Sequence, residues 1–321
     1  MGVAIETDHL TKKYGSFLAD DGIDLTVEQG ELFGFIGPNG AGKTTAIRML
    51  SGLLQPSSGR GQVLQFDIIK DADEIRSRIG LVPENSNTYP YLPVKYNLEF
   101  MAKLYRVPRK SRAKVVHELL DYFALTDKAN DLAINLSKGL SRRLIIACAL
   151  VHDPEILFLD ELTSGLDVQS TKNILAKVKE LNERGRTIFL TAHRMQEIEQ
   201  LCDRVAIINH GKIVACGSVD SLRTAADQFD IIELAMYDPV DKELIDWLQR
   251  KHSTDRVHLS KETNMVSVEV QDAEISVPVI LEMAAKLGAV VKSVRVKEAT
   301  LEDVFIKLTE KPGEGEVEVN A

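Results

Sequence analysis

A glycine-rich run near the start of the sequence has the pattern of a phosphate-binding loop. Residues Gly37 to Thr44 read Gly-Pro-Asn-Gly-Ala-Gly-Lys-Thr, which matches glycine, four residues, glycine, lysine and a hydroxyl residue. Glycines let backbone N–H groups surround phosphate oxygens where side chains would obstruct them. Lys43 would then contact the β- and γ-phosphates, and the Thr44 hydroxyl would serve Mg²⁺. A chance glycine turn is the alternative, but an apolar run before it and a helical pattern after it favour nucleotide binding.

A pair of acids after an apolar run supplies the matching chemistry. Ile156-Leu-Phe-Leu159 predicts a buried strand, with Asp160 and Glu161 at its carboxyl end, where ligands collect in open α/β sheets. We expect Asp160 to hold Mg²⁺ through water and Glu161 to polarise the water that attacks the γ-phosphate. Two such acids alone are more often surface turn residues, but together with the loop they favour ATP hydrolysis.

The elements that must position these residues alternate in type along the first two-thirds of the chain. Short, almost continuously apolar runs at 31–36, 155–159 and 187–191 are typical of strands covered on both faces. A helical pattern follows the loop at 43–53, and 205–215 predicts a hairpin with glycine at its turn. This alternation predicts an α/β sheet.

Two further segments differ from this alternation in their pattern of apolar residues. Apolar residues at helical spacing predict a helical insertion at about 89–140. After a boundary at residue 228, segment 229–310 predicts the order βαββαβ plus a last helix, which is a ferredoxin-like α+β accessory domain. Thr300 and Asp303 would form a capping box for that helix. Residues 311–321 are rich in Glu and Gly and are expected to form a frayed, disordered tail.

Composition narrows the class of protein. The 321 residues carry 48 acids and 39 bases, a formal charge of −9, which disfavours direct nucleic-acid binding through a basic surface. Residues 230–321 hold 19 of the acids and 11 of the bases, so the acidity belongs mainly to the accessory domain. We see no signal peptide and no apolar run of the roughly 20 residues that span a membrane. Three cysteines without metal-type spacing fit a reduced intracellular chain.

These motifs together resemble the ATPase subunits of ABC transporters, over about residues 5–222. The resemblance implies a P-loop NTPase core with a helical subdomain. It also implies that Tyr14 stacks on adenine, that Ser137 and Gly139 of a signature segment contact a γ-phosphate, and that Asp167 lies at a dimer interface. A lone histidine is usually structural, but His193, at the end of an expected strand, resembles the switch histidine that contacts the γ-phosphate. The remaining implied ATP-binding residues are those of the loop: Gly37, Pro38, Asn39, Gly40, Ala41, Gly42, Lys43, Thr44 and Thr45.

Three departures from the family pattern bear on turnover. The signature, usually Leu-Ser-Gly-Gly-Gln, has lysine at its third position and Leu140 at its fifth. Glu84 replaces the glutamine that contacts Mg²⁺ and the attacking water, so the expected metal ligands are Thr44, Glu84 and Asp160. Leu162 replaces the proline after the catalytic glutamate, which removes a fixed φ from that turn.

The resemblance also implies partners. ATP, with Mg²⁺, would bind between two copies of the chain, because Ser137 and Gly139 of one copy close over the loop of the other, giving a homodimer. Segment 85–97 resembles the surface that grips a separate transmembrane permease, although an aromatic-rich surface loop is the alternative. The C-terminal extension resembles that of exporter ATPases of the drug-resistance and sodium-extrusion type. The chain would therefore be cytoplasmic, peripheral on the inner face of the membrane through its permease.

Two other functions remain open at the level of sequence. One is a soluble ABC ATPase that acts on ribosomes or DNA, although the single cassette and the acidic composition disfavour it. The other is a weakly hydrolysing nucleotide-dependent regulator, suggested by Glu84, Leu140 and Leu162. The cargo of a transporter would be selected by the permease, so this sequence does not specify it.

Overall fold

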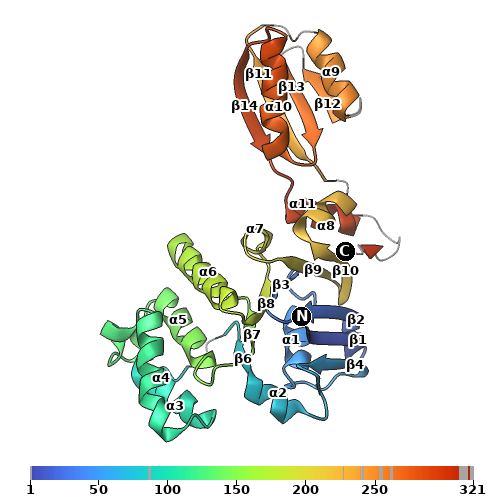
Figure 1. Ribbon diagram of the computed structural model, residues 1–321. Helices are drawn as coiled ribbons and strands as arrows, with labels where there is room; N and C mark the ends of the chain where they lie inside the picture. Colours follow the sequence, from blue (N-terminus) through green and yellow to red (C-terminus); the bar gives the residue numbers. More distant parts are fainter. Residues whose placement is uncertain are drawn as a thin grey trace. The chain divides into compact units, whose positions relative to one another are not determined.

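The chain folds as two compact units in the computed structural model (Figure 1). The first unit comprises residues 1–218 and 316–320, and the second comprises 219–315. The sequence-based boundary at 228 lies too far along the chain, because helix α8 (Val219–Ala225) groups with the second unit. The structure describes residues 2–85, 88–226, 228–238, 240, 242–252, 256–260, 263–310 and 317–318.

The first unit is built around a sheet in the order β15-β10-β9-β3-β8-β7-β6. Its five strands from β9 to β6 run parallel to their neighbours, as the alternation of apolar runs and helices predicts. Every residue of β3, β7 and β8 is buried, which confirms that both faces of the sheet are covered. The strands are β3 (Leu32–Ile36), β6 (Ile79–Val82), β7 (Ile156–Asp160), β8 (Thr187–Ala192), β9 (Arg204–Asn209), β10 (Lys212–Ser218) and β15 (Val317–Glu318).

Two features at the β10 edge concern expectations from the sequence. The predicted hairpin is present, since β9 and β10 are antiparallel and the turn residues His210 and Gly211 have φ of 47° and 81°, as a type I′ turn requires. Val317 and Glu318 pair with β10 and so differ from the expected disordered tail. The other residues of 311–321 lie outside the described ranges.

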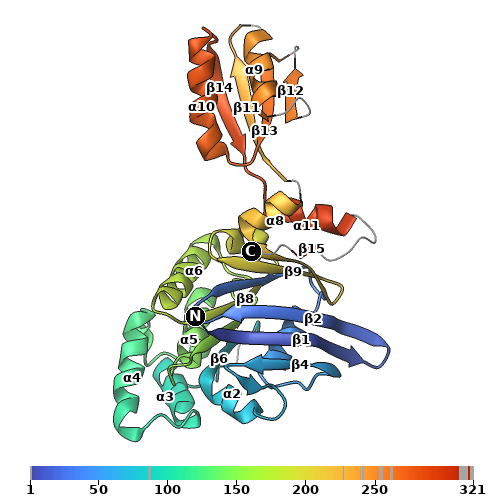
Figure 2. The ribbon, with the colours of Figure 1, turned by 45° about the vertical axis from the view of Figure 1, so that its right-hand side comes forward.

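A second, antiparallel sheet lies beside the first in the order β2-β1-β4-β5 (Figure 2). This sheet was not among the elements expected from the sequence. Its long strands β1 and β2 contribute Ile5, Ile23 and Val27 to a core shared with β3 and α1. The elements are β1 (Val3–Tyr14), β2 (Phe17–Glu28), α1 (Lys43–Leu50), β4 (Ser58–Val63), β5 (Phe66–Asp67) and α2 (Ala72–Arg78).

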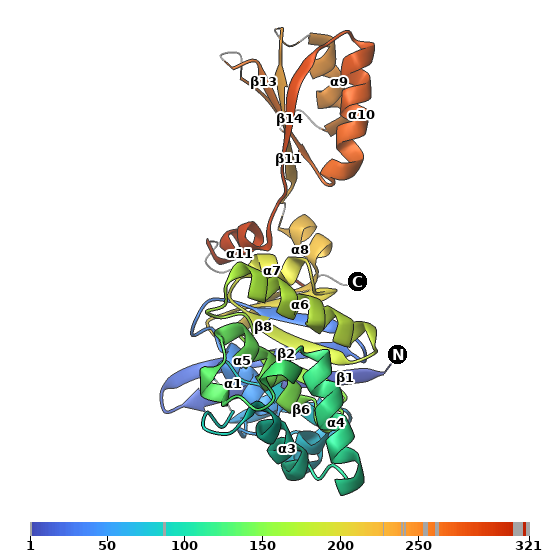
Figure 3. The ribbon, with the colours of Figure 1, turned by 90° about the vertical axis from the view of Figure 1, so that its left-hand side faces the viewer.

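The helical insertion forms a cluster at one side of the first unit, seen together in all views (Figure 3). Its third helix runs past the predicted end at 140 and leads into β7. Two further helices flank β8. The helices are α3 (Val94–Leu104), α4 (Arg109–Tyr122), the 3₁₀ turns at Thr126–Lys128 and Ala133–Asn135, α5 (Lys138–Ala149), α6 (Val168–Glu183) and α7 (Met195–Glu199). None of the helices in the described ranges combines the length and apolarity that a bilayer span requires.

The second unit confirms the predicted ferredoxin-like order. Its antiparallel sheet has the order β12-β13-β11-β14, and α9 and α10 cover one face (Figure 3). The predicted capping box is present, because Thr300 N donates to Asp303 (2.9 Å) and Asp303 N donates to Thr300 Oγ1 (3.2 Å). The elements are β11 (Asp230–Met236), α9 (Lys242–His252), β12 (Val257–Ser260), β13 (Met265–Val270), α10 (Ala273–Lys286), β14 (Val291–Lys297) and α11 (Leu301–Glu310).

Candidate functional site

The glycine-rich loop connects β3 to α1 at the carboxyl edge of the parallel sheet. Gly42 is the N-cap residue of α1 and has a φ of 119°, a conformation that residues with a Cβ rarely adopt. A Cβ at Gly37 would lie 2.2 Å from the carbonyl oxygen of Ile208. The loop therefore needs glycine at both positions, one for its backbone conformation and one for a close approach to β9. The resulting helix N-terminus offers N–H groups to an anion.

Lys43 is buried and is held by three acceptors. Its Nζ donates to the carbonyl oxygens of Gly37 (2.8 Å) and Pro38 (3.1 Å) and lies 3.1 Å from Glu161 Oε1. The structure thus brings the lysine of the loop and the acid after β7 into direct contact, although the two motifs are far apart in the sequence.

Asp160 is the centre of a second group of oxygens. Thr44 Oγ1 donates to one carboxylate oxygen of Asp160 (2.9 Å), and Thr191 Oγ1 donates to the other (2.7 Å). Hydroxyl and carboxylate oxygens at this spacing are hard ligands of the kind that Mg²⁺ prefers, so Thr44 and Asp160 fit the expected metal. Glu84 is exposed, and no hydrogen bond or ion pair recorded within the described ranges joins its carboxylate to these two residues.

Glu161 is fixed by contacts on both sides of its carboxylate. Lys43 approaches Oε1, and His193 Nδ1, just after β8, contacts Oε2. The backbone of Glu161 has a φ of 49°, and its N–H donates to Thr191 Oγ1 (3.1 Å). A non-glycine residue in this left-handed region costs free energy, and the surrounding contacts hold it there. Leu162, which follows, is 1% exposed, so its side chain is packed inside the protein next to this turn.

The signature and dimer-loop residues lie at two helix N-termini. Ser137 is the N-cap residue of α5 and accepts a hydrogen bond from the N–H of Leu140. Asp167 caps α6 by accepting from Ser170 N (2.8 Å) and Oγ (2.7 Å), and these hydrogen bonds lower the pKa of Asp167. A Cβ at Gly139 would lie 2.6 Å from Ser170 Oγ, so a tight packing of α5 on α6 also requires this glycine.

Tyr14 ends β1 and is 46% exposed, and the Lys12 ammonium lies over its ring, 5.3 Å from the centroid. No contact recorded within the described ranges joins Tyr14, Ser137 or Asp167 to the loop.

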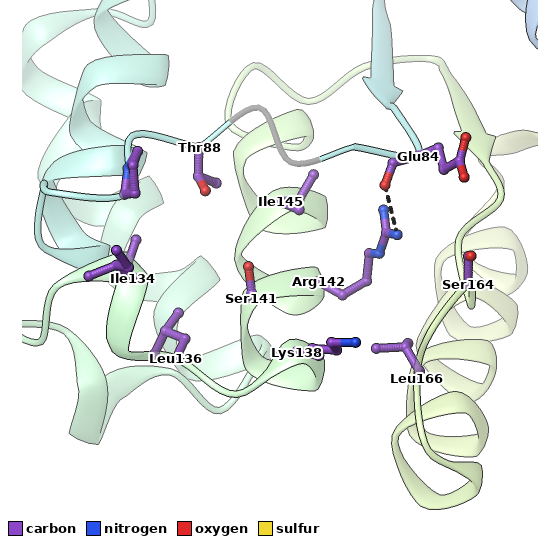
Figure 4. Close-up of a pocket in the computed structure, with 12 residues that line it drawn as sticks. Glu84, Thr88, Ile134, Leu136, Lys138, Ser141, Arg142, Ile145, Ser164 and Leu166 are labelled. Atoms are coloured by element: carbon purple, nitrogen blue, oxygen red, sulfur yellow. Dashed lines mark hydrogen bonds between the residues drawn. The ribbon is translucent and has the colours of Figure 1, made fainter.

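Arg142 is a functional candidate that sequence reasoning missed. It projects from α5 into a cavity of about 560 Å³ that Glu84, Lys138 and Leu166 also line (Figure 4). Its guanidinium donates to the carbonyl oxygens of Pro83 (2.9 Å) and Glu84 (3.0 Å). Burial lowers the pKa of Arg142, and the charge of Glu84 opposes that shift. Arg142 therefore connects the helical insertion to the segment after β6. In the sequence, the one sign of this role was a basic residue on an otherwise apolar face of this helix.

Two family models match the chain, one over each unit. Residues 21–164 match the model described as ABC transporter. Residues 217–309 match the model described as ATP-binding protein DrrA1-3-like, C-terminal domain.

Relatives align over almost the whole chain. The linearmycin resistance ATP-binding protein of Bacillus subtilis (strain 168) is 35% identical, over 95% of this chain and 98% of its own length. The daunorubicin/doxorubicin resistance ATP-binding protein of Streptomyces peucetius is 32% identical, over 97% and 94%. The Nod factor export ATP-binding protein I of Paraburkholderia xenovorans (strain LB400) is 38% identical, over 95% and 97%.

Solved structures show the same fold for the first unit. An ATP-binding subunit of an ABC transporter superposes with a TM-score of 0.63 at 26% identity, over 69% of this chain and 92% of that one. A bacterial ABC transporter cassette solved as a dimer gives 0.61 at 27%, over 67% and 98%. With the phosphate loop, the acids after β7 and the near full-length relatives all in agreement, the chain belongs to the ABC transporter family as one of its ATP-binding proteins, an ATPase.

Proposed function

We propose that this chain is the ATP-hydrolysing subunit that energises a separate membrane permease for export. The observation that carries the proposal is the contact between Lys43 and Glu161, with His193 on the far side of the same carboxylate. Relatives that align over nearly the full length are named for drug resistance or for export, and this favours an exporter over an ATPase that acts on ribosomes or DNA.

The geometry supports a sequence of events at the site. Phosphate oxygens of ATP in the loop compete with Glu161 for the Lys43 ammonium, so binding releases Glu161 Oε1 for the attacking water. Glu161 then accepts a proton from that water as a general base. His193, in contact with Oε2, keeps the carboxylate aimed. Mg²⁺, held by Thr44 and Asp160, would neutralise charge on the β- and γ-phosphates.

A homodimer completes the site in this proposal. Ser137 and Gly139 of one copy would close over ATP bound to the other, with Asp167 at the interface and Tyr14 stacked on adenine. The solved cassette described as a dimer in a post-hydrolysis state with ADP and Pi supports this arrangement. Because α5 and α6 are packed tightly at Gly139 and Ser170, their N-termini would approach the partner as one rigid body.

The surface that receives the permease would lie between β6 and α3. Asn97 is buried and fixes this loop, accepting from Tyr89 N (2.7 Å) and donating to the carbonyl oxygens of Tyr89 and Leu92 (both 3.1 Å). Tyr91 in this loop and Tyr96 in the first turn of α3 are nevertheless 76% and 55% exposed. A surface that is held by hydrogen bonds and yet exposes large aromatic residues is typical of a docking site. It would place the chain on the inner face of the membrane.

The test is co-purification with the membrane protein encoded by the neighbouring reading frame, from detergent-solubilised membranes. Tyr91→Asp and Tyr96→Asp should each lose at least about tenfold of the bound partner, because each buries a charge in an apolar contact. ATP hydrolysis by the isolated subunit should be retained. Tyr237→Asp is the matched control, since Tyr237 is 65% exposed in the second unit. Equal partner recovery with all three variants would contradict the assigned surface.

A further inference from the structure

Asp20, on β2, is a buried carboxyl group that the proposed mechanism does not use. Its side chain is 0% exposed, and both carboxyl oxygens lack a hydrogen-bond partner among the described residues. A buried carboxylate without partners is strongly unfavourable, whereas the neutral acid costs much less. The Asp20 side chain is therefore expected to be protonated, and its burial needs an explanation.

Its position points to the phosphate loop. Asp20 Oδ1 lies only 2.1 Å from where a Cβ on Gly42 would be, and the carbonyl oxygen of Ala19 lies 2.8 Å from the same point. On either side, Asp21 N donates to Gly211 O (2.8 Å), and Gly211 N donates to Ala41 O (2.9 Å). These contacts press the Asp20 carboxyl against the N-cap residue of α1, the helix whose N-terminus faces the phosphates.

The charged groups on the neighbouring elements are engaged elsewhere. Lys12, opposite Asp20 on β1, donates to the carbonyl oxygen of Gln55 (2.6 Å). Lys43 of α1 is held by the loop and by Glu161. At the β9–β10 hairpin, Lys212 pairs with Asp21 (3.2 Å), and His210 occupies the turn. Burial alone raises the pKa of Asp20 to about 8, so the group is a neutral acid at pH 7.

We propose that Asp20 is a positioning residue that supports the phosphate loop through Gly42 in its protonated form, and that loss of this proton weakens nucleotide binding. A neutral carboxyl group packs against Gly42 without placing a negative charge beside the loop. A carboxylate at the same place is an anion at the N-terminus of α1, where it competes with the nucleotide phosphates for the helix dipole and the N–H groups. The inference rests on nucleotide binding at this loop, as in the proposed function.

The linkage between proton binding and nucleotide binding makes the effect of Asp20 measurable as a pH dependence of nucleotide affinity. If only the protonated form binds well, the dissociation constant rises by about tenfold per pH unit above the Asp20 pKa. By reciprocity, binding at a pH near that pKa draws a proton onto the protein. Both effects belong to the full chain without any partner.

The experiment is titration calorimetry of the full chain with MgADP, which is not hydrolysed, between pH 7 and pH 9. The wild type should bind about tenfold more weakly at pH 9 than at pH 7. In Asp20→Asn, which keeps the shape and removes the charge, the affinity should stay nearly constant. Asp21→Asn is the matched control: Asp21 is the adjacent acid, is partly exposed, and should keep the wild-type dependence.

A second measurement on the wild type needs no variant. At pH 8.5, binding enthalpies in two buffers of different ionisation enthalpy should reveal proton uptake, and at pH 7 little or none. Parallel pH profiles for wild type and Asp20→Asn, or no proton uptake at pH 8.5, would overturn the inference. A wild type that binds MgADP at no pH would overturn the phosphate-loop assignment as well. If Asp20→Asn fails to fold, Asp20→Leu and the proton count decide.

Discussion

At the scale of single residues, the site contains buried side chains of opposite charge that lie in direct contact. Lys43 and Glu161, both almost fully buried, face each other at 3.1 Å, and each would be costly to bury alone. In the proposed mechanism, the phosphates of ATP would compete for Lys43 and open this ion pair. The same contact would also orient Glu161, the proposed base.

The predicted site residues that the structure brings together are those with strong local signals in the sequence. Lys43, Asp160, Glu161 and His193 follow strands whose apolar character is plain, and parallel strands deliver their ends to one edge. Asp20 had no such signal, because its burial depends on a loop and a hairpin turn that are distant in the sequence. Glu84 stays a predicted metal ligand: its position in the family pattern suggested this role, and within the part of the chain that the structure describes no hydrogen bond or ion pair joins its carboxylate to Thr44 or Asp160.

Glu161→Gln tests the role of the base. The amide keeps the size and a hydrogen bond to Lys43, so nucleotide binding should persist, but it cannot accept the proton of the attacking water. We expect the rate of phosphate release to fall by roughly 10²–10⁴-fold, and MgATP to trap a dimer visible by size-exclusion chromatography. Glu155→Gln, at an exposed ion pair with Arg78, is the control. Unchanged phosphate release in Glu161→Gln would show that another group is the base.

At the scale of elements, the strands that are fully buried were easier to predict from the sequence than the strands that are partly exposed. The strands β3, β7 and β8 are buried on both faces, so their apolar runs were unmistakable. The strand β1 is half exposed, and its register shifts between Thr7 and Leu10, where His9 has a φ of 48°. Such a bulge breaks the two-residue alternation on which strand prediction depends. The strand β1 is hard to predict for that reason, whereas β2 alternates regularly, with Ile23, Leu25 and Val27 buried, and was predictable from its pattern.

Arg142 links helix α5 to the segment after β6 through two hydrogen bonds. Arg142→Ala should therefore leave that segment loose and two carbonyl groups without a donor. We expect a loss of about 2 kcal/mol in the free energy of unfolding, measured by urea titration, and a lower kcat with little change in MgADP affinity. Arg142→Lys should restore part of both.

The neighbouring residue provides a control for this prediction. Arg143 lies on the same helix and makes one long contact, 3.5 Å to the carbonyl oxygen of Phe123. Arg143→Ala should therefore change kcat and stability much less than Arg142→Ala. If the two variants behave alike, the segment after β6 does not depend on Arg142.

At the scale of the whole molecule, the two units have hydrophobic core clusters that share no residue among those the structure describes. One contains Phe33, Phe35 and Phe158 and lies in the first unit, and the other contains Leu244 and Val266 and lies in the second. Helical and strand patterns were enough to predict two domains and the order of elements in the second. The exact boundary was not predictable, because α8 is a short helix that the sequence alone assigns to neither unit.

Because the cores are separate, ligand binding should stabilise one unit and not the other. The chain has one tryptophan, Trp247 on α9, which packs against the second core with Lys251 over its ring at 5.2 Å. Its fluorescence therefore reports unfolding of the second unit, whereas far-UV circular dichroism reports unfolding of both units.

MgADP at about 100 times its dissociation constant should add about 2.7 kcal/mol to the free energy of unfolding of the unit that binds it. In urea, the main dichroism transition should move to higher concentration while the Trp247 transition stays in place. Lys43→Ala, which weakens binding, should abolish the shift. A Trp247 transition that moves together with the dichroism would instead mean that the two units unfold as one cooperative body.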